Sequence, residues 1–236
     1  MGKILICGAN GTLAENYISL YPNNDYILLD KDFENDFQHT NNSNIYRFDF
    51  NCKDDYMELK SYLSYNEFKI AGIVFFQGVQ FANSFFSVTE KEWEKTLDIN
   101  VKSILFTLKH LFTFIDNSCS IVVLASQNGV VGHINRIDYG TSKAALIHLV
   151  KNLSLEFAQV KEKDIKINCI SPGYIYSEKS KDFLETYKGQ ILKAKIPYDS
   201  FVLPMDVSHT IDFLMSDKSM AIRGQNIILD YGYTLC

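Results

Sequence analysis

The sequence predicts a doubly wound α/β domain with about seven parallel strands and helices on both faces. Short, continuously apolar runs alternate with helix-like stretches almost throughout, as expected for parallel strands buried on both faces. Several runs stop at a glycine turn or a polar residue, where such sheets bind ligands. The chain has 236 residues and is 47% hydrophobic, enough for one large core. We therefore expect a single domain over residues 1–236.

The composition favours a small-molecule partner. The formal net charge is -5 and the lysines are scattered, so no nucleic-acid footprint is present. The apolar run at 1–7 is too short for a signal peptide or membrane span. The five cysteines are widely spaced and lack a CxxC pair, which predicts reduced thiols in a cytoplasmic protein and neither a metal site nor a disulfide framework. They are Cys7, Cys52, Cys119, Cys169 and Cys236.

The first predicted strand, Lys3–Cys7, runs into a glycine turn and then a helix over Thr12–Leu20. Gly8, Gly11 and Ala14 form a GxxGxxA pattern, a relaxed variant of the dinucleotide fingerprint. Residues without a bulky Cβ let a pyrophosphate approach the backbone, and the helix N-terminus offers free N–H groups. A purely structural turn is the alternative. The cofactor contacts predicted here are Gly8, Asn10, Gly11, Thr12 and Leu13.

The second predicted strand, 26–29, ends in Asp30, 22 residues after Gly8. A dinucleotide fold places there the acidic residue that binds the adenosine ribose. Because a carboxylate repels a 2′-phosphate, NAD is favoured over NADP. Lys31 is a neighbouring cation that would tolerate the phosphate. The polar stretch 30–44 is interpreted as a surface loop.

A third strand at 45–50, a helix at 54–65 and a fourth strand at 71–76 follow. Ligands bind beyond the C-terminal ends of parallel strands. The residues at these two strand ends are thus candidates for the adenine and ribose pocket, with ordinary loop residues as the alternative: Asp49, Phe50, Phe76, Gln77 and Gly78.

A capping sequence at 89–92 precedes a long helical pattern from 93 to about 114 that contains Asn100. By position alone Asn100 is solvated or satisfied in the core. A fifth strand, 120–125, ends at Ser126. Tyr139 and Lys143 then share one face of the next helix, where a cation stabilises a phenolate. Chance supplies such a pair on many solvated helices.

The rest of the chain continues the alternation. We predict a sixth strand at 166–170 and a sharp turn at 171–173. The segment 175–203 is polar and weakly periodic, which is typical of a lid over a site. A helix at 204–215 and a last strand at 226–230 complete the domain.

Together, these motifs resemble the short-chain dehydrogenase/reductase family from Lys3 to Gly232. Asn100, Ser126 and the Tyr-x-x-x-Lys pair of Tyr139 and Lys143 look like its catalytic tetrad. Residues 168–173 match its N-x-x-x-P-G stretch, and 222–232 its closing G-Q…D-x-G segment. By resemblance, further cofactor contacts are Tyr139, Lys143, Pro172, Gly173, Ile175 and Ser177, with Ser177 where a Thr that binds the nicotinamide carboxamide is common.

The chain departs from the family pattern at two places. Cys7 replaces the leading Thr of the glycine motif, and Ala14 its last glycine. The usual N-N-A-G after the fourth strand is Phe75-Phe76-Gln77-Gly78 here, which removes two polar anchors beside the cofactor.

The resemblance implies a Rossmann-like fold and reversible hydride transfer between NAD(H) and a secondary alcohol or ketone. Tyr139 is the implied acid and base, and Lys143 holds the nicotinamide ribose and lowers the pKa of Tyr139. Ser126 hydrogen-bonds the substrate oxygen, and Asn100 supports a water relay. A homodimer or homotetramer is also implied.

Two other functions stay open. One is a non-catalytic cofactor-binding protein with a regulatory or scaffold role, which the altered Gly8 and Phe75 regions favour and the intact tetrad disfavours. The other is an epimerase of an activated sugar that uses the cofactor transiently. Lysines of the 175–203 segment would attract its anionic substrate. They are Lys179, Lys181, Lys188, Lys193 and Lys195.

Overall fold

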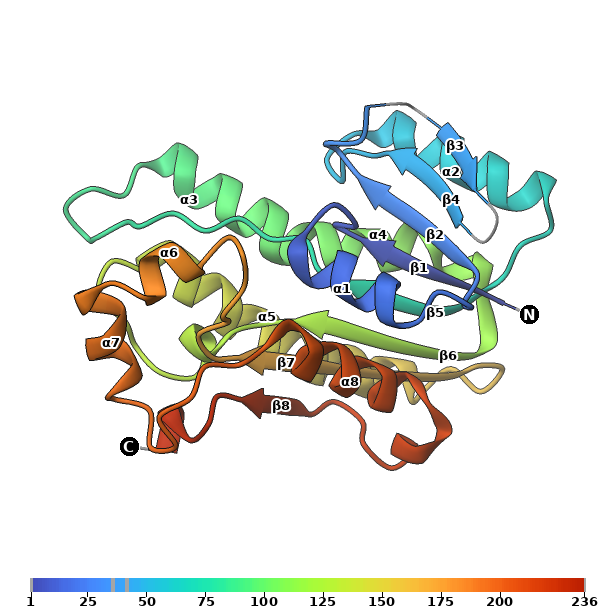
Figure 1. Cartoon of the computed structure of the whole chain (residues 1–236). Coiled ribbons are helices and arrows are strands. Elements are labelled where there is room, and N and C mark those ends of the chain that lie inside the picture. The colour runs from blue at the N-terminus through green and yellow to red at the C-terminus, as the bar shows by residue number, and fades with distance from the viewer. Residues whose placement is uncertain (1, 35–36, 41–42, 236) are drawn as a thin grey trace.

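One eight-stranded sheet forms the centre of the computed structural model, which describes residues 2–34, 37–40 (backbone only) and 43–235. The strand order is β3-β4-β2-β1-β5-β6-β7-β8. Seven strands run parallel, and β3 pairs antiparallel with β4 at one edge (Figure 1). The strands are β1 (Lys3–Cys7), β2 (Tyr26–Asp30), β3 (Phe37–Thr40), β4 (Ser43–Arg47), β5 (Ile70–Phe75), β6 (Ile115–Leu124), β7 (Asp164–Pro172) and β8 (Asn226–Leu229).

Helices cover both faces of the sheet, as predicted. Two separate apolar clusters show this: α2, α4 and α5 pack on one face, and α1 and α8 on the other. The helices are α1 (Thr12–Leu20), α2 (Lys53–Tyr65), α3 (Glu90–Leu97), α4 (Ser103–Leu111), α5 (Ile137–Phe157), α6 (Lys181–Leu184), α7 (Tyr187–Lys193) and α8 (Pro204–Met215). The doubly wound Rossmann-like fold is confirmed.

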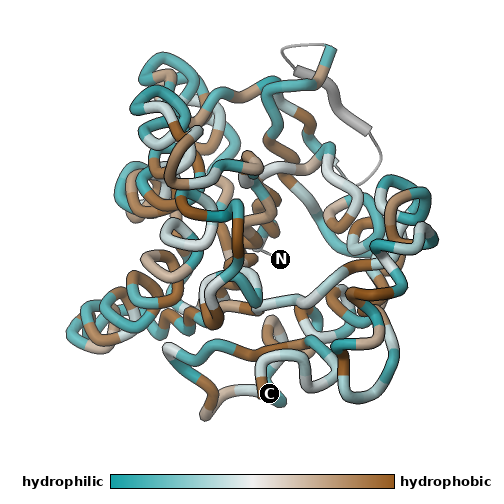
Figure 2. Tube along the Cα trace, turned by 90° about the vertical axis from the view of Figure 1, so that its left-hand side faces the viewer, coloured by the Kyte–Doolittle hydropathy of each residue, from teal (hydrophilic) through white to brown (hydrophobic). Residues whose placement is uncertain are grey.

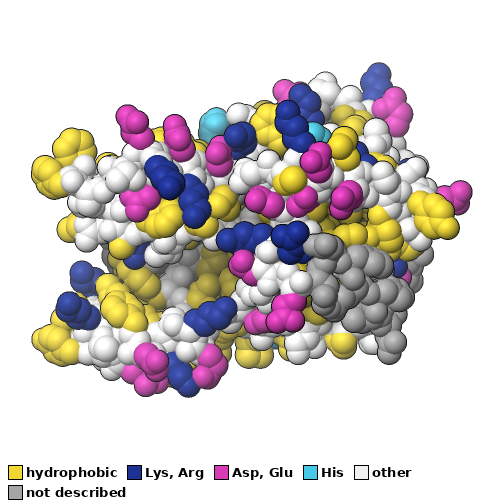
Figure 3. All heavy atoms as spheres, turned by 90° about the horizontal axis from the view of Figure 1, so that it is seen from above, with side chains coloured by type: hydrophobic (Ala, Val, Ile, Leu, Met, Phe, Trp, Pro, Cys, Tyr) yellow, Lys and Arg dark blue, Asp and Glu magenta, His cyan; other side chains and the backbone are white. Residues whose placement is uncertain are grey.

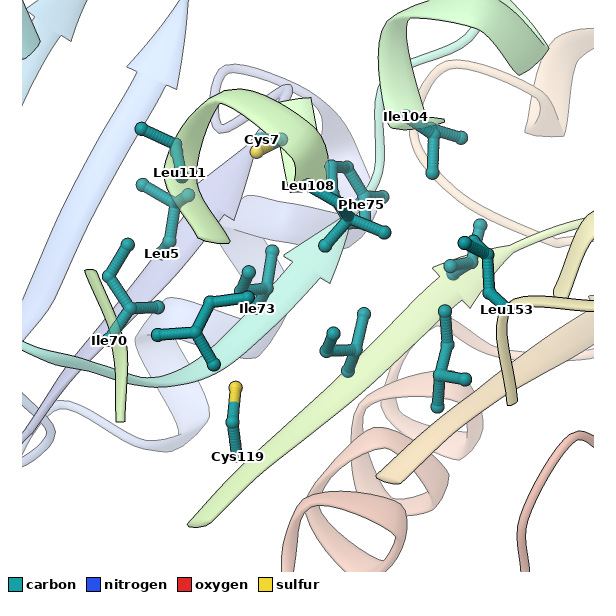
Figure 4. Close-up of a cluster of buried hydrophobic side chains, with 14 of the residues drawn as sticks. Leu5, Cys7, Ile70, Ile73, Phe75, Ile104, Leu108, Leu111, Cys119 and Leu153 are labelled. Carbon is teal, nitrogen blue, oxygen red and sulfur yellow. The ribbon is translucent and has the colours of Figure 1, made fainter. Parts of the chain in front are cut away.

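The core on the first face joins distant parts of the chain. Leu5 of β1, Ile73 of β5 and Leu108 of α4 are fully or almost fully buried and lie in one cluster (Figure 4). Figure 2 shows hydrophobic stretches gathered towards the centre and hydrophilic ones on the outer turns of the helices. Burial of these aliphatic side chains contributes about 2 kcal/mol each, and it fixes the strand ends that carry the site.

The third predicted strand and the surface loop need correction. The strand at 45–50 is β4 over Ser43–Arg47, and part of the predicted loop 30–44 is the edge strand β3. Residues 35–36 and 41–42 of that loop lie outside the described part. β3 pairs with β4 alone, and its polar sequence carries no buried-strand pattern. The alternation of apolar residues therefore did not reveal it.

The long helix predicted from residue 93 to about 114 consists mainly of three consecutive helical segments. Thr89 and Glu92 form a capping box at the start of α3. A π-helical turn, η1 (Asp98–Lys102), then joins α3 to α4. Such a turn inserts a residue into an α-helix and is frequent at functional sites. Asn100 lies in it and is fully buried.

The structure adds two further observations. Cys7, Cys52, Cys119 and Cys169 are free thiols, and Cys236 lies outside the described residues. Among the helices of the described ranges, none combines the length and hydropathy that crossing a bilayer requires.

Candidate active site

The glycine turn after β1 lies where the strand order reverses. The chain winds outward from β1 through β2 and returns to β5 on the other side of β1, and ligands bind at such a switch point. Gly8 has φ +80, and a Cβ there would meet the backbone nitrogen of Gln77 at 2.5 Å. The turn therefore needs glycine for its dihedral angle and for the close approach of β5.

Asp30 lies at the end of β2, beside the glycine turn. It is buried, and its Oδ2 accepts a hydrogen bond from the backbone nitrogen of Asn10 at 3.0 Å. Its Oδ1 accepts from the backbone nitrogen of Asp32 at 3.0 Å. Lys31 is exposed and faces Asp32 at 3.8 Å. The carboxylate is thus fixed at the mouth of the turn with lone pairs left for a ligand.

Tyr139, Lys143 and Ser126 converge beyond the ends of β5 and β6. Tyr139 and Lys143 project from the first two turns of α5, and Lys143 Nζ lies 5.7 Å from the centre of the Tyr139 ring. The ammonium is buried and donates to the carbonyl of Leu124 at 2.7 Å. Burial lowers the pKa of Lys143 to about 8, because a low-dielectric site disfavours its charged form.

The phenol of Tyr139 has a raised pKa in the free protein. Burial raises it, whereas a hydrogen bond with Ser126 and the positive charge of Arg136 lower it. The implied lowering by Lys143 is not seen here, since that ammonium is held on Leu124. Loss of the proton at neutral pH therefore requires a further favourable charge in the site.

Asn100 lies behind this group and holds two segments together. Its Oδ1 accepts from the backbone nitrogen of Val79 at 2.8 Å, and its Nδ2 donates to the carbonyl of Val79 at 2.9 Å. Nδ2 also donates to Ser142 Oγ at 2.9 Å. The amide is satisfied in the core, one of the readings its position allowed, and it connects η1 to α5 and to the chain after β5.

A cavity of about 840 Å³ opens in front of the Tyr139 group. Figure 3 shows this hollow between the lobe of α3 and the lobe of α6 and α7. Nine of the predicted site residues line it: Leu13, Phe76, Gly78, Ser126, Tyr139, Lys143, Pro172, Gly173 and Ile175.

The other predicted residues lie elsewhere. Gly8, Asn10, Gly11, Thr12, Asp30 and Gln77 form or flank the glycine turn. Asp49 is exposed, and its Oδ1 accepts from the backbone nitrogen of Asn51. The ring of Phe50 packs against Phe48, with centroids 5.0 Å apart. Ser177 contacts Ser180, and of these two only Ser180 lines the cavity.

The sequence indicated the segments 127–138, 174–203 and the tail as those that select the substrate, but it did not single out most of their residues that line the cavity. The residues concerned include His133, Arg136, Tyr174, Ser180, Lys195 and Tyr233. They come from four separate loops and short helices. The Tyr-x-x-x-Lys motif gives one signal for Arg136, which lies three residues before Tyr139 and thus on the same side of the helix start.

The site has the features that a nicotinamide cofactor requires. A Cβ on Gly78 would lie 3.4 Å from both Lys143 Nζ and Asn100 Oδ1, and one on Gly173 would lie 3.0 Å from Asp230. These glycines keep open a space that side chains would fill. Gln77, Gln127 and Asn128 each carry a buried amide oxygen without a hydrogen-bond partner among the described residues. Such acceptors are costly unless a ligand donates to them.

Comparison with known proteins gives a consistent result. A family model described as enoyl-(acyl carrier protein) reductase matches residues 29–234. An NAD-dependent glycerol dehydrogenase of Listeria innocua is 32% identical over 149 residues, 62% of this chain and 57% of that protein. A 3-oxoacyl-(acyl-carrier-protein) reductase of Staphylococcus aureus is 30% identical over 157 residues, 66% of this chain and 62% of that protein. The matched region thus covers less than two thirds of the length of these relatives.

Solved structures share the whole fold. A 4-hydroxyisoleucine dehydrogenase complexed with NADH has a TM-score of 0.88 at 24% identity, with full coverage of both chains. A short chain dehydrogenase family protein from Francisella tularensis subsp. tularensis SCHU S4 has a TM-score of 0.87 at 22% identity, again with full coverage of both. ElxO with NADP bound reaches 0.85 at 22%, covering 100% of this chain and 99% of that one.

Proposed function

The chain belongs to the short-chain dehydrogenase/reductase family, and from this we propose that it transfers a hydride reversibly between a nicotinamide cofactor and a small secondary alcohol or ketone. One observation carries the proposal. Ser126, Tyr139 and Lys143 lie together on the wall of the large cavity, with the buried ammonium of Lys143 5.7 Å from the centre of the Tyr139 ring.

The bound nicotinamide supplies the hydride chemistry, so the protein has to orient the carbonyl and move one proton. Ser126 donates a hydrogen bond to the substrate oxygen and stabilises the negative charge that develops there. Tyr139 gives its proton to that oxygen in reduction and takes it back in oxidation. Lys143, whose ammonium is held on Leu124, would hold the nicotinamide ribose, and the oxidised nicotinamide would supply the further positive charge that favours loss of the Tyr139 proton.

NAD is the proposed cofactor, with NADP less favoured. Asp30 is buried at the end of β2, where we expect the adenosine ribose, and its carboxylate is fixed by two backbone N–H groups. A 2′-phosphate placed there would meet a negative charge in a partly dry site. Lys31 is paired with Asp32, which reduces its capacity to compensate.

The lysines of the 175–203 segment give little support to the epimerase alternative. Lys181 is paired with Glu178, and Lys193 faces Asp199 at 3.9 Å. Of the five, only Lys195 lines the cavity. We keep the proposal that this segment, which contains α6 and α7, acts as the substrate lid, because it forms one wall of the cavity.

We also propose a cytoplasmic homodimer or homotetramer. Phe106 of α4 and Leu155 of α5 are 40% and 70% exposed. A second copy that packs on these helices would bury apolar side chains of this kind.

The test is a panel of ketones and alcohols assayed with NAD(H) and NADP(H) side by side. We expect turnover with NAD(H) and a loss of about 10²- to 10⁴-fold in the Tyr139→Phe variant, the usual contribution of general acid–base catalysis. Tyr187→Phe, an exposed position on α7, is the matched control. Full turnover by Tyr139→Phe would contradict the assignment.

Two other results discriminate the alternatives. Substrate isomerisation without net NADH formation would favour an epimerase. No change in NADH fluorescence on mixing, together with no turnover, would favour a non-catalytic protein.

A further inference from the structure

The wall of the cavity carries unbalanced positive charge. Its lining includes Arg136, Lys143, Lys195 and the imidazole of His133, and it contains no Asp or Glu. Lys143 is committed to the carbonyl of Leu124. Arg136 and Lys195 form no ion pair with a carboxylate in the described part of the chain. Two cations therefore face an open space without a counter-charge.

Arg136 is held in place by neutral groups. Its Nη1 donates to the carbonyl of Asn135 at 2.7 Å. The amide oxygen of Gln80, in the orientation that satisfies both groups, accepts from Nη2 at 3.1 Å and from Nε at 3.3 Å. These bonds fix the guanidinium without neutralising it. These two partners leave one N–H on each Nη for a further acceptor, and a carboxylate is the acceptor that suits a guanidinium best.

His133 and Lys195 complete the same region. The imidazole stacks on the ring of Tyr233, with centroids 5.7 Å apart and planes 9° apart. Its Nε2 is buried and without a hydrogen-bond partner among the described residues. Burial lowers the pKa of His133, and the charges of Arg136 and Lys195 lower it further. All three residues line the same cavity.

Arg136 and the proposed acid Tyr139 are neighbours at the start of α5. Arg136 directly precedes the helix and lies three residues before Tyr139, a separation of about 4.5 Å along a helix axis. Its charge acts on the Tyr139 phenol. The residues of the glycine turn, where the cofactor pyrophosphate is predicted, do not line the cavity apart from Leu13. Arg136 is therefore placed for the substrate.

We propose that Arg136, together with Lys195 and His133, binds a carboxylate of the substrate, so that the natural substrate is an oxo acid or hydroxy acid. Apolar residues, including Ile134, Phe183 and Leu192, line the same cavity and accommodate a hydrocarbon chain. The assignment of the reacting carbon to Tyr139 rests on the proposed function, whereas the carboxylate site does not.

The test compares acids with their neutral methyl esters. The probes are 2-oxohexanoate, 3-oxohexanoate and 4-oxohexanoate with the matching esters, titrated calorimetrically into the full chain with and without NADH. We expect at least one acid to bind about tenfold or more tightly than its ester, as a desolvated charge-assisted pair requires. The acid-to-ester ratio should approach one in Arg136→Gln and recover in part in Arg136→Lys.

Two controls keep the outcome unambiguous. Arg223→Gln removes an arginine whose guanidinium is paired with Asp164 outside the cavity, and it should leave the ratio unchanged. Lys195→Gln should lower the ratio by a smaller factor than Arg136→Gln. Equal affinity for every acid and ester, an unchanged ratio in Arg136→Gln, or displacement of the acid by inorganic phosphate at lower concentration would overturn the proposal.

The binding measurement needs no turnover, so the two proposals fail separately. Acid-selective binding that depends on Arg136, without turnover of any probe, would support the carboxylate site and count against the oxidoreductase function. Turnover of esters and acids alike, with equal affinities, would support the oxidoreductase function and count against the carboxylate site.

Discussion

Asn100 pairs with the backbone of Val79 as one strand pairs with another: its amide accepts from the nitrogen at 2.8 Å and donates to the carbonyl at 2.9 Å. Val79 lies just beyond Gly78, on the wall of the cavity. The chain after β5 is therefore fixed by a side chain from η1, and the position of Gly78 depends on it.

The first prediction concerns this pairing. Asn100→Ala removes three hydrogen bonds and leaves the Val79 backbone groups unpaired, so we expect a loss of about 3 kcal/mol in the free energy of unfolding. Denaturant unfolding measures it. Asn117→Ala, at an exposed position, should change stability by less than about 0.5 kcal/mol. Equal stabilities of the two variants would show that the amide is dispensable.

The second prediction concerns the glycine turn. Gly8→Ala places a Cβ 2.5 Å from the nitrogen of Gln77 on a backbone with φ +80. We expect a loss of about 2–4 kcal/mol in stability, from backbone strain and displacement of the turn, and a loss of NADH binding measured by fluorescence. Gly132→Ala is the control, since a Cβ there meets nothing within 4 Å. Tight NADH binding by Gly8→Ala would refute the assigned role of the turn.

The third prediction concerns cofactor choice. Asp30→Asn removes the negative charge at the end of β2, so the ratio of kcat/KM for NADH over NADPH should fall about tenfold or more. Asp32→Asn, which neutralises an exposed carboxylate two residues away, should shift the ratio much less. If both variants keep the wild-type ratio, Asp30 does not select the cofactor.

The fourth prediction follows from burial of Lys143. Its pKa is about 8 in the folded protein, below the ordinary 10.5. Between these values the unfolded chain binds more protons than the folded one, so stability rises with pH. From pH 8 to 9.5 the gain from this group is about 1.5 kcal/mol.

Lys143→Met removes the titrating group and supplies the comparison. Unfolding of both proteins at pH 8 and 9.5 should show the gain in the wild type and not in the variant. Parallel pH profiles would mean that Lys143 titrates normally. Burial raises the pKa of several tyrosines, such as Tyr26. Their titration in the unfolded chain lowers stability above about pH 10, so the measurement is kept below that pH.

The sequence predicted the order of the elements because buried parallel strands and their helices leave strong local patterns. It missed β3, whose single antiparallel neighbour imposes no such pattern. The Tyr139, Lys143 and Ser126 group was predictable because its motif is short and lies at two neighbouring strand ends. For the wall around Arg136 and His133 the sequence indicated the segments but not the individual residues, since loops distant in sequence meet there only after folding. Ser180 shows the same limit, because a local turn places it on the wall instead of Ser177.

The π-helical turn also limits the insertions and deletions that this part of the chain can accommodate. Thr96 Oγ1, upstream of the turn, donates to Asp138 of α5 at 2.8 Å, and Asn100 within it donates to Ser142 of the same helix. Deleting one residue from Asp98–Lys102 would rotate the upstream helix by about 100° and shift it by about 1.5 Å. One of the two bonds to α5 would then break. Apart from Asn100, a substitution in this turn leaves the register between α3 and α4 unchanged, whereas a change of one residue in its length does not.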